Sequence, residues 1–184
     1  MKKILIACLL IVSFSFTAFS QGTTITVPKI PIDTVTKKIT YTEKVEQKGI
    51  QDTLYYRAIH WCNSYFKNPQ SVTTIRDQVN GKIEGIYRFK VYNQPDKEGT
   101  ITEAGVVSYT FTIEMKENKY RYKITDFNLK GVSYFVLERW LDKTDKSYIP
   151  AWDYYLTQVD ENMLDFIKSL KKGMLEAVKV SDDW

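Results

Sequence analysis

The sequence predicts a single α+β domain with the element order strand, helix, four strands, helix, in which the strands form one antiparallel sheet. Two observations lead to this prediction. Over 72–93 and 105–127, apolar and polar residues alternate with the period of two that is typical of half-buried strands. Over 52–69 and 153–178, apolar residues recur every three or four positions, as on one face of a helix. Because no second sheet is predicted, the long C-terminal helix must cover the apolar face of the sheet.

The first residues, "MKKILIACLLIVSFSFTAFSQG", combine two lysines, an apolar run and the small residues Ala18 and Ser20. This is the pattern of a secretory signal peptide, so we expect cleavage between Ser20 and Gln21 and export to the periplasm or beyond. The letters "LIAC" before the apolar run ends also match a lipoprotein box at Cys8, but they leave almost no hydrophobic region ahead of it. No later stretch is apolar enough for a transmembrane helix, and none is expected.

Removal of 1–20 takes away Lys2 and Lys3, which lowers the formal charge from +4 to +2. A balance this even argues against a protein built to bind a polyanion such as nucleic acid. Cys62 is the one cysteine left, so no disulfide can form within the exported chain. Residues 21–38 contain two prolines and many threonines and are predicted to be an extended leader to a single domain over 39–180.

The first strand and helix follow that leader. From Ile39, apolar Tyr41 and Val45 alternate with polar residues. The helix then follows, with Asp52 or Thr53 placed to cap its start and Pro69 to mark its end. Its apolar face is predicted to contain Leu54, Ala58, Trp61, Cys62 and Tyr65.

The first hairpin turns at Asn80-Gly81. A three-residue loop, 79–81, with Gly81 in the left-handed conformation, keeps the aromatic residues on one face. This register places Arg76 opposite Glu84 on the other face. The apolar face is then predicted to hold Thr73, Ile75, Ile83, Tyr87, Phe89 and Val91.

The second hairpin contains "KENKYRYKITDF", where basic and aromatic residues alternate. Folding it about Glu117-Asn118 makes every opposing pair match in kind, so the aromatic residues are interpreted as core and the basic ones as the other face. The predicted pairs are Met115 with Tyr120, Ile113 with Tyr122, Phe111 with Ile124, Glu114 with Arg121, Thr112 with Lys123 and Thr110 with Thr125. Residues 131–152 show no regular pattern. The final helix is predicted to bury Leu156, Val159, Met163, Phe166, Ile167, Leu170, Met174 and Val178.

The segments "YTEKVEQKGIQDTLYYRAIHW", "NGKIEG" and "YTFTIEMKENKYRYKITD" resemble a family of exported bacterial proteins of unknown function with a TATA-binding-protein-like fold. The resemblance covers about 39–178. It implies a curved antiparallel sheet with both helices on its convex side, and it brings no catalytic residues.

Few residues could support catalysis or bind a cofactor. With one histidine, His60, and one cysteine left after removal of 1–20, a zinc site of His and Cys ligands cannot be assembled in one exported chain. His60 is predicted to be exposed and Cys62 to be buried and inert, pointing in diverging directions on the helix. No glycine-rich phosphate loop is present, and no metal or cofactor is expected. The alternative function is a hydrolase that acts on an envelope polymer and uses carboxylates as its acid and base. The candidate carboxylates are Asp77, Glu84, Glu114, Asp126 and Asp153. Asp126 is expected opposite Tyr109 on the core side of the sheet.

The face of the sheet that carries the polar residues is the remaining candidate site. It is predicted to hold Thr40, Thr42, Lys44, Thr74, Arg76, Arg88, Lys90, Thr110, Thr112, Glu114, Arg121 and Lys123. In the TATA-binding protein the corresponding surface grips DNA, but export removes this chain from the genome and no wedge phenylalanines lie on this face.

Besides the hydrolase, a binding module and a lipid carrier remain open as functions. A non-enzymatic module could bind an unknown envelope ligand or protein partner, with a candidate site of Arg88, Lys90, Thr112, Glu114, Arg121 and Lys123. The same face could instead be a solvated surface. A lipid carrier would need a hollow between helix and sheet.

Overall fold

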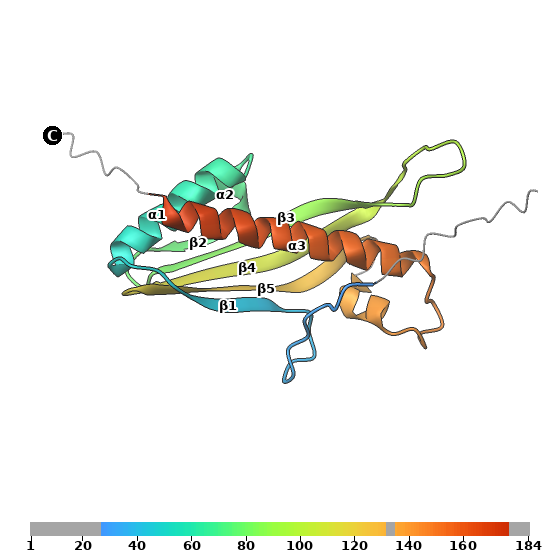
Figure 1. Cartoon of the computed structure of the whole chain (residues 1–184), viewed down its shortest axis with the longest axis horizontal. Coiled ribbons are helices and arrows are strands. Elements are labelled where there is room, and N and C mark those ends of the chain that lie inside the picture. The colour runs from blue at the N-terminus through green and yellow to red at the C-terminus, as the bar shows by residue number, and fades with distance from the viewer. Residues whose placement is uncertain (1–26, 132–134, 177–184) are drawn as a thin grey trace, which may run out of the picture.

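The computed structural model of the chain describes residues 27–131 and 135–176. Figure 1 shows one sheet with the long helices α1 and α3 on the same face. The elements in chain order are β1 (Tyr41–Glu46), α1 (Gln51–Tyr65), α2 (Pro69–Val72), β2 (Thr73–Asp77), β3 (Lys82–Tyr92), β4 (Glu103–Lys116), β5 (Lys119–Lys130), β6 (Phe135–Val136), the 3-10 helix η1 (Leu137–Leu141) and α3 (Ala151–Leu175). The predicted α+β architecture is confirmed. The predicted signal peptide, Cys8 and Val178 lie outside the described residues.

The strands form one antiparallel sheet in the order β1-β5-β4-β3-β2, and β6 pairs with β5 beyond the end of β1. β1 therefore pairs with a strand made much later in the chain. The six pairs predicted for the β4–β5 hairpin, from Met115 with Tyr120 to Thr110 with Thr125, are all confirmed. The alternation of its aromatic and basic residues is thus explained by the two faces of a strand.

The core lies between the sheet and the two helices. Phe166 of α3 packs its ring 5.6 Å from that of Phe111 on β4, and Phe66, which follows α1, stacks on Phe111 at 5.3 Å. Leu54, Ala58, Trp61 and Cys62 of α1 are buried as predicted, and so are Leu156, Val159, Met163, Phe166, Leu170 and Met174 of α3. The apolar stripes of both helices therefore cover the apolar face of the sheet.

The start of α1 differs from the prediction. Ile50 is the N-cap residue, and no side chain bonds the free amides there, so neither Asp52 nor Thr53 is the cap. Asp52 instead lies in the first turn, where its charge complements the helix dipole. The helix ends before Pro69, which begins the short helix α2.

The β2–β3 turn is one residue longer than predicted. Gly81 has the expected left-handed φ of 60°, but its amide bonds the carbonyl of Gln78, and the last strand pair is Asp77 with Lys82. The loop is therefore 78–81, and the shift of one residue exchanges the faces of Ile75 and Arg76. A bulge between Thr73 and Ile75 keeps Thr73 buried on the helix side, as predicted. Arg76, expected on the polar face opposite Glu84, lies opposite Ile83 on the helix side. Ile75 lies opposite Glu84 on the other side.

Asp126 also lies elsewhere than predicted. The β4–β5 register shifts between Ser108 and Thr110, and Asp126 takes a left-handed φ of 58°, as expected at a bulge. Its carboxylate turns away from the core and accepts a 2.5 Å ion pair from Lys38, while Phe127 is fully buried. The extra residue in the bulge lets the chain keep Phe127 in the core.

The segments without predicted structure pack beside each other at one end of this layer, where the amide of Ile39 donates to Glu138 Oε1 of η1 at 2.8 Å (Figure 1). Ile32 of the leader forms an isolated antiparallel bridge with Ile39, and Ile30 is buried. After β6, Leu137 and Trp140 of η1 are buried, and the Trp140 ring lies 5.5 Å from that of Tyr155. Among the described helices, none has the length and apolar character needed to cross a membrane.

Candidate functional site

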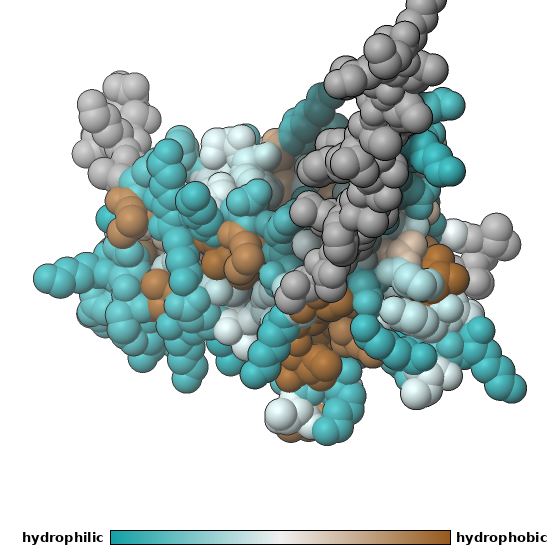
Figure 2. Space-filling view, turned by 45° about the vertical axis from the view of Figure 1, so that its right-hand side comes forward, coloured by the Kyte–Doolittle hydropathy of each residue, from teal (hydrophilic) through white to brown (hydrophobic). Residues whose placement is uncertain are grey.

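The surface carries no single dominant apolar patch on the side seen in Figure 2, where apolar residues appear in several areas separated by hydrophilic ones. Scattered apolar exposure of this kind is normal for a folded protein. The open face, which we define as the face of the sheet opposite α1 and α3, is distinguished by its charges instead.

Charged side chains line up across the open face near the β4–β5 turn. Strand pairing places Lys44 of β1 opposite Arg121 of β5, Arg121 opposite Glu114 of β4, and Glu114 opposite Lys82 of β3. Two residues nearer the β4–β5 turn, Lys119 of β5 lies opposite Lys116 of β4 on one side and opposite Glu46 of β1 on the other. Residues from four strands therefore meet on one small area of the sheet.

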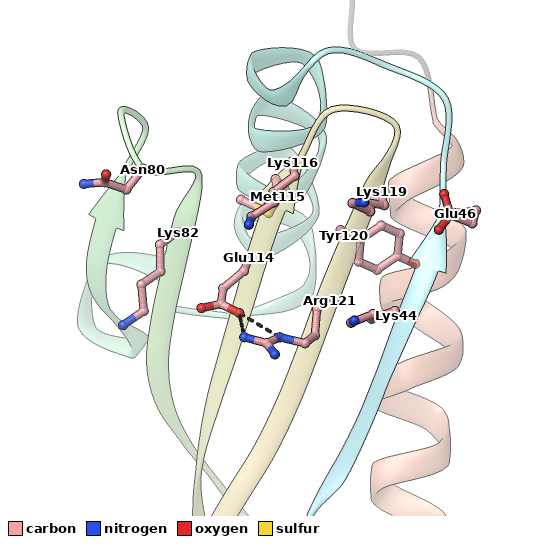
Figure 3. Close-up of a pocket in the computed structure, with 10 residues that line it drawn as sticks. All are labelled: Lys44, Glu46, Asn80, Lys82, Glu114, Met115, Lys116, Lys119, Tyr120 and Arg121. Carbon is pink, nitrogen blue, oxygen red and sulfur yellow. Dashed lines mark hydrogen bonds and ion pairs between the residues drawn. The ribbon is translucent and has the colours of Figure 1, made fainter.

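These residues surround a pocket of about 570 Å³, which we call the cationic pocket. Figure 3 shows its side chains projecting from β1, β3, β4 and β5. Five basic and two acidic side chains contribute to the lining, which consists of Lys44, Glu46, Asn80, Lys82, Glu114, Met115, Lys116, Lys119, Tyr120 and Arg121. The excess of positive charge makes the pocket suited to an anion.

Two of the five cations are neutralised within the site. Arg121 donates from Nε to Glu114 Oε2 at 2.8 Å and from Nη2 to the same oxygen, and Lys82 pairs with Glu84 at 2.9 Å. Lys44, Lys116 and Lys119 form no ion pair within 27–131 and 135–176. Three ammonium groups at the pocket are thus available to a ligand.

Beside its opposite-charge pairs, the strand pairing at this pocket contains two like-charged contacts. Lys116 lies directly opposite Lys119, and Lys44 lies directly opposite Arg121. Like charges directly opposite each other destabilise a sheet, whereas opposite charges stabilise it by about 0.2–1 kcal/mol. A bound anion between these groups would remove the repulsion. Unfavourable local contacts such as these like-charged pairs are expected at functional sites.

The six residues predicted as a site are not all brought together. Glu114 and Arg121 line the cationic pocket, and Thr112 and Lys123 form the next cross-strand pair along the open face. Arg88 and Lys90 lie further along β3, opposite Ser108 and Val106, where Lys90 pairs with Glu103 at 2.7 Å.

The residues that the predicted site missed are Lys44, Lys82, Lys116 and Lys119. Lys116 and Lys119 flank the Glu117-Asn118 turn, so the hairpin register alone could have placed them opposite each other. Lys44 was expected on the open face, but its position beside Arg121 depends on the pairing of β1 with β5.

The five candidate carboxylates are separately engaged. Glu114 pairs with Arg121, Glu84 with Lys82, Asp126 with Lys38, and Asp153 with Lys143. Asp77 accepts hydrogen bonds from the side chain and main chain of Asn80, which lower the pKa of its carboxyl.

A general acid of a hydrolase needs the opposite shift, toward a raised pKa. The described residues contain no group of three or more His, Cys, Asp or Glu side chains placed to hold a metal.

The α1 residues His60 and Cys62 lie as the helical spacing predicts. His60 is exposed, whereas Cys62 is fully buried, and burial raises the pKa of its thiol to about 12. A neutral, buried thiol is a poor nucleophile. The pair therefore forms no thiolate–imidazole couple.

A lipid carrier would need a hollow between helices and sheet. That space is occupied by aromatic rings: Phe166 contacts Phe111 and Trp61, and Phe66 contacts Tyr87. These centroid distances of 4.8 to 5.6 Å are those of packed rings. The carrier function is not supported by this arrangement.

The fold and the open sheet face define this chain as an α+β domain with a fold like that of the TATA-binding protein. Residues 41–130 match the model of the family described as "Domain of unknown function (DUF4468) with TBP-like fold". The predicted resemblance is therefore confirmed over the first five strands and α1.

Two solved structures share the fold. A TBP-like protein from Parabacteroides distasonis ATCC 8503 superposes with a TM-score of 0.62 at 12% sequence identity, covering 81% of this chain and 99% of that one. A DUF4468 family protein from Bacteroides ovatus ATCC 8483 gives a TM-score of 0.56 at 13% identity, covering 77% of this chain and 90% of that one. A search of curated proteins finds no match. At these identities the likeness shows the fold alone.

Proposed function

We propose that the protein is a non-enzymatic binding module of the bacterial cell envelope that takes an anionic group of its ligand into the cationic pocket. The observation that carries the proposal is the pair of like-charged cross-strand contacts at this pocket, Lys116 with Lys119 and Lys44 with Arg121. Three of the surrounding lysines form no ion pair with the described residues. An anion bound at such a site would form ion pairs with the lysines and would reduce the repulsion between the like-charged side chains.

The even overall charge is compatible with this proposal because the excess of cations is local. A pocket of this volume lies within the range for small-molecule sites, about 300–1,000 Å³. It therefore suits one charged group or a short anionic segment of a ligand better than a long polyanion. The single anionic group could belong to a free small molecule or to a larger envelope component.

The test is a titration of the protein with inorganic tripolyphosphate, which carries several negative charges within the dimensions of the pocket. We expect binding that weakens with added salt, because exposed charges are screened. The double variant Lys44→Gln/Lys116→Gln should weaken binding by about two- to thirtyfold, since each exposed ion pair contributes about 0.2–1 kcal/mol. The same variant should melt no lower than the original protein in the absence of ligand, because it removes one member of each like-charged pair.

The matched control is Lys97→Gln/Lys146→Gln, which removes the same charge from exposed lysines that form no ion pair within the described part of the chain. This control should bind tripolyphosphate as the original protein does. Equal weakening in both double variants would mean that binding follows net charge, and the proposal would be wrong. The intact mass of the protein recovered from the cell envelope separately tests the proposed export, since retention of Met1 to Ser20 would contradict it.

A further inference from the structure

The outer edge of β3 is only partly covered. β2 pairs with Lys82–Gly85, and β3 continues to Tyr92 with no strand on its outer side within the described residues. At the far end, Gln158 of α3 donates from Nε2 to the carbonyl of Tyr92, and its Oε1 accepts from the amide of Tyr92, both at 2.9 Å. A side-chain amide thus satisfies the main chain at Tyr92 as a neighbouring strand would.

The direction of the remaining main-chain groups follows from two contacts. Tyr92 bonds Gln158 on the outer side, and the carbonyl of Glu84 accepts from Thr74 Oγ1 of β2. Because the amide and carbonyl of alternate residues in a strand point the same way, those of Ile86, Arg88 and Lys90 also point outward. The pairing of Thr73 with Gly85 brings the carbonyl of Val72 to the amide of Ile86, so this amide is already covered. No strand of the described residues pairs with Arg88 or Lys90 on the outer side. The uncovered stretch from Arg88 to Lys90 is about 10 Å long.

The side chains along this edge favour an acidic partner. On the open face the edge presents Arg88, which forms no ion pair with the described residues, and Lys90, which pairs with Glu103. Arg88 also borders a hollow of about 250 Å³ whose lining includes Lys67. On the helix side the edge presents the half-buried rings of Tyr87 and Phe89. A strand laid here would meet cations on one face and apolar surface on the other.

We propose that the Ile86–Lys90 edge binds an extended acidic segment of another polypeptide as an added strand. Main-chain hydrogen bonds to Arg88 and Lys90 provide the affinity, and an acidic residue opposite Arg88 provides the specificity. A second copy of this chain fits less well. The pairing of two copies that overlaps all five residues places Arg88 opposite the second copy's Arg88, which is repulsive. Cations on an edge strand commonly prevent such self-association.

The first test is amide hydrogen exchange of the protein, measured by NMR at several protein concentrations. The amides of Arg88 and Lys90 should exchange at least tenfold faster than those of Tyr87 and Phe89, which point toward β4. Slow exchange of these two outward amides at low protein concentration would mean that the chain covers its own edge. Protection that increases with protein concentration would mean that a second copy covers it. Either result would overturn the proposal.

The second test uses three capped eight-residue peptides as probes. The first alternates glutamate with threonine, the second alternates lysine with threonine, and the third is the glutamate peptide with alternate amides methylated. At saturation the glutamate peptide should slow exchange of the Arg88 and Lys90 amides at least tenfold, whereas the other two should not. Equal effects of the glutamate and lysine peptides, or binding without protection of these amides, would contradict the proposal.

Two variants locate the peptide. Arg88→Glu should lose the glutamate peptide and gain the lysine peptide, while the matched control Lys97→Glu should leave both unchanged. Lys44→Gln/Lys116→Gln, which alters the cationic pocket, should bind the glutamate peptide normally. Loss of the peptide in that double variant would place it in the pocket and refute the edge as its site, whereas the tripolyphosphate titration tests the pocket on its own.

Discussion

Tyr122 and its neighbours Arg121 and Lys123 show how one strand separates stability from surface chemistry. Tyr122 is 4% exposed on the helix side of β5, and its hydroxyl donates to Glu43 Oε2 at 2.8 Å. The side chain of Arg121 is 52% exposed on the open face. Lys171 of α3 pairs with the same carboxylate of Glu43 at 2.7 Å, and together with the Tyr122 hydroxyl it lowers the pKa of Glu43. Tyr122 therefore joins β1, β5 and α3.

Substitution of Tyr122 by alanine should destabilise the protein by about 3–5 kcal/mol, because it removes a buried ring and leaves a cavity. Tyr122→Phe should cost only about 1 kcal/mol, since it removes the hydrogen bond alone. Urea unfolding of the two variants measures both values.

The comparison variant for Tyr122→Ala is Arg121→Ser/Lys123→Ser, which should change stability by about 0.5 kcal/mol or less per residue. A stable Tyr122→Ala protein together with an unfolded Arg121→Ser/Lys123→Ser protein would reverse the assignment of the two faces.

At the scale of elements, the close approach of α1 and α3 depends on Gly173. A Cβ atom at this position would lie 2.6 Å from Cδ1 and 2.8 Å from Cβ of Trp61. Trp61 is itself fixed, because it is 3% exposed and its Nε1 donates to Ser169 Oγ at 3.0 Å. The two helices can therefore adopt this spacing only with glycine at 173.

Gly173→Ala should destabilise the protein by about 1–3 kcal/mol through overpacking, although alanine is the better helix former by about 1 kcal/mol. Glu161→Ala at an exposed position of the same helix serves as the control and should be nearly neutral. Thermal unfolding of both variants measures the difference. A Gly173→Ala protein more stable than the original would show that the helices can move apart at little cost.

Prediction of these elements from sequence succeeded where both faces of a hairpin agree. In the β4–β5 hairpin every opposing pair matches in kind, so one register was favoured over all others. In the β2–β3 hairpin, Ile75 and Ile86 are apolar residues on the open face and Arg76 is a basic residue on the helix side. The alternation of apolar and polar residues there predicts the wrong faces for Ile75 and Arg76. The residue types in the turn do not reveal that the loop has one residue more than predicted.

The candidate site was predictable only in part for a related reason. The Glu114–Arg121 pair follows from a local hairpin, whereas the contact of Lys44 with Arg121 requires β1 to pair with β5. No local signal specifies that pairing, because β1 and β5 are separated by α1 and three strands. The partly open edge of β3 was likewise hidden, since it depends on where β2 ends.

At the scale of the whole molecule, the core contains many ionisable groups that are held neutral. Burial is the main cause in each case: it raises the pKa values of Cys62 and Tyr120 to about 12, and it raises those of Tyr41, Tyr109 and Tyr122 as well. In the unfolded chain these groups lose their protons near pH 8.5 for cysteine and about 10 for tyrosine.

The free energy of unfolding should therefore fall as pH rises above about 9. In this range the unfolded chain binds fewer protons than the folded one, so the slope of stability against pH is negative. Below about pH 8 both states keep these protons, and the contribution of these groups is constant and complete. Urea unfolding between pH 7 and 11 measures the slope, together with the rate at which a thiol reagent labels Cys62. Rapid labelling of the native protein at pH 8 would contradict the burial of this thiol.

The pairing of β1 with β5 also determines when the domain can form during synthesis. Glu43 leaves the ribosome 79 residues before Tyr122, the partner of its side chain, and Tyr41 precedes its partner Asp160 by 119 residues. Contacts between such distant positions slow folding, because the intervening chain must first be ordered. The nascent chain therefore has no partner for its first strand until β5 has been made, and its last helix must arrive before the core can close. If the chain is exported as proposed, this late closure of the core favours the unfolded state that a translocation channel for unfolded polypeptides requires.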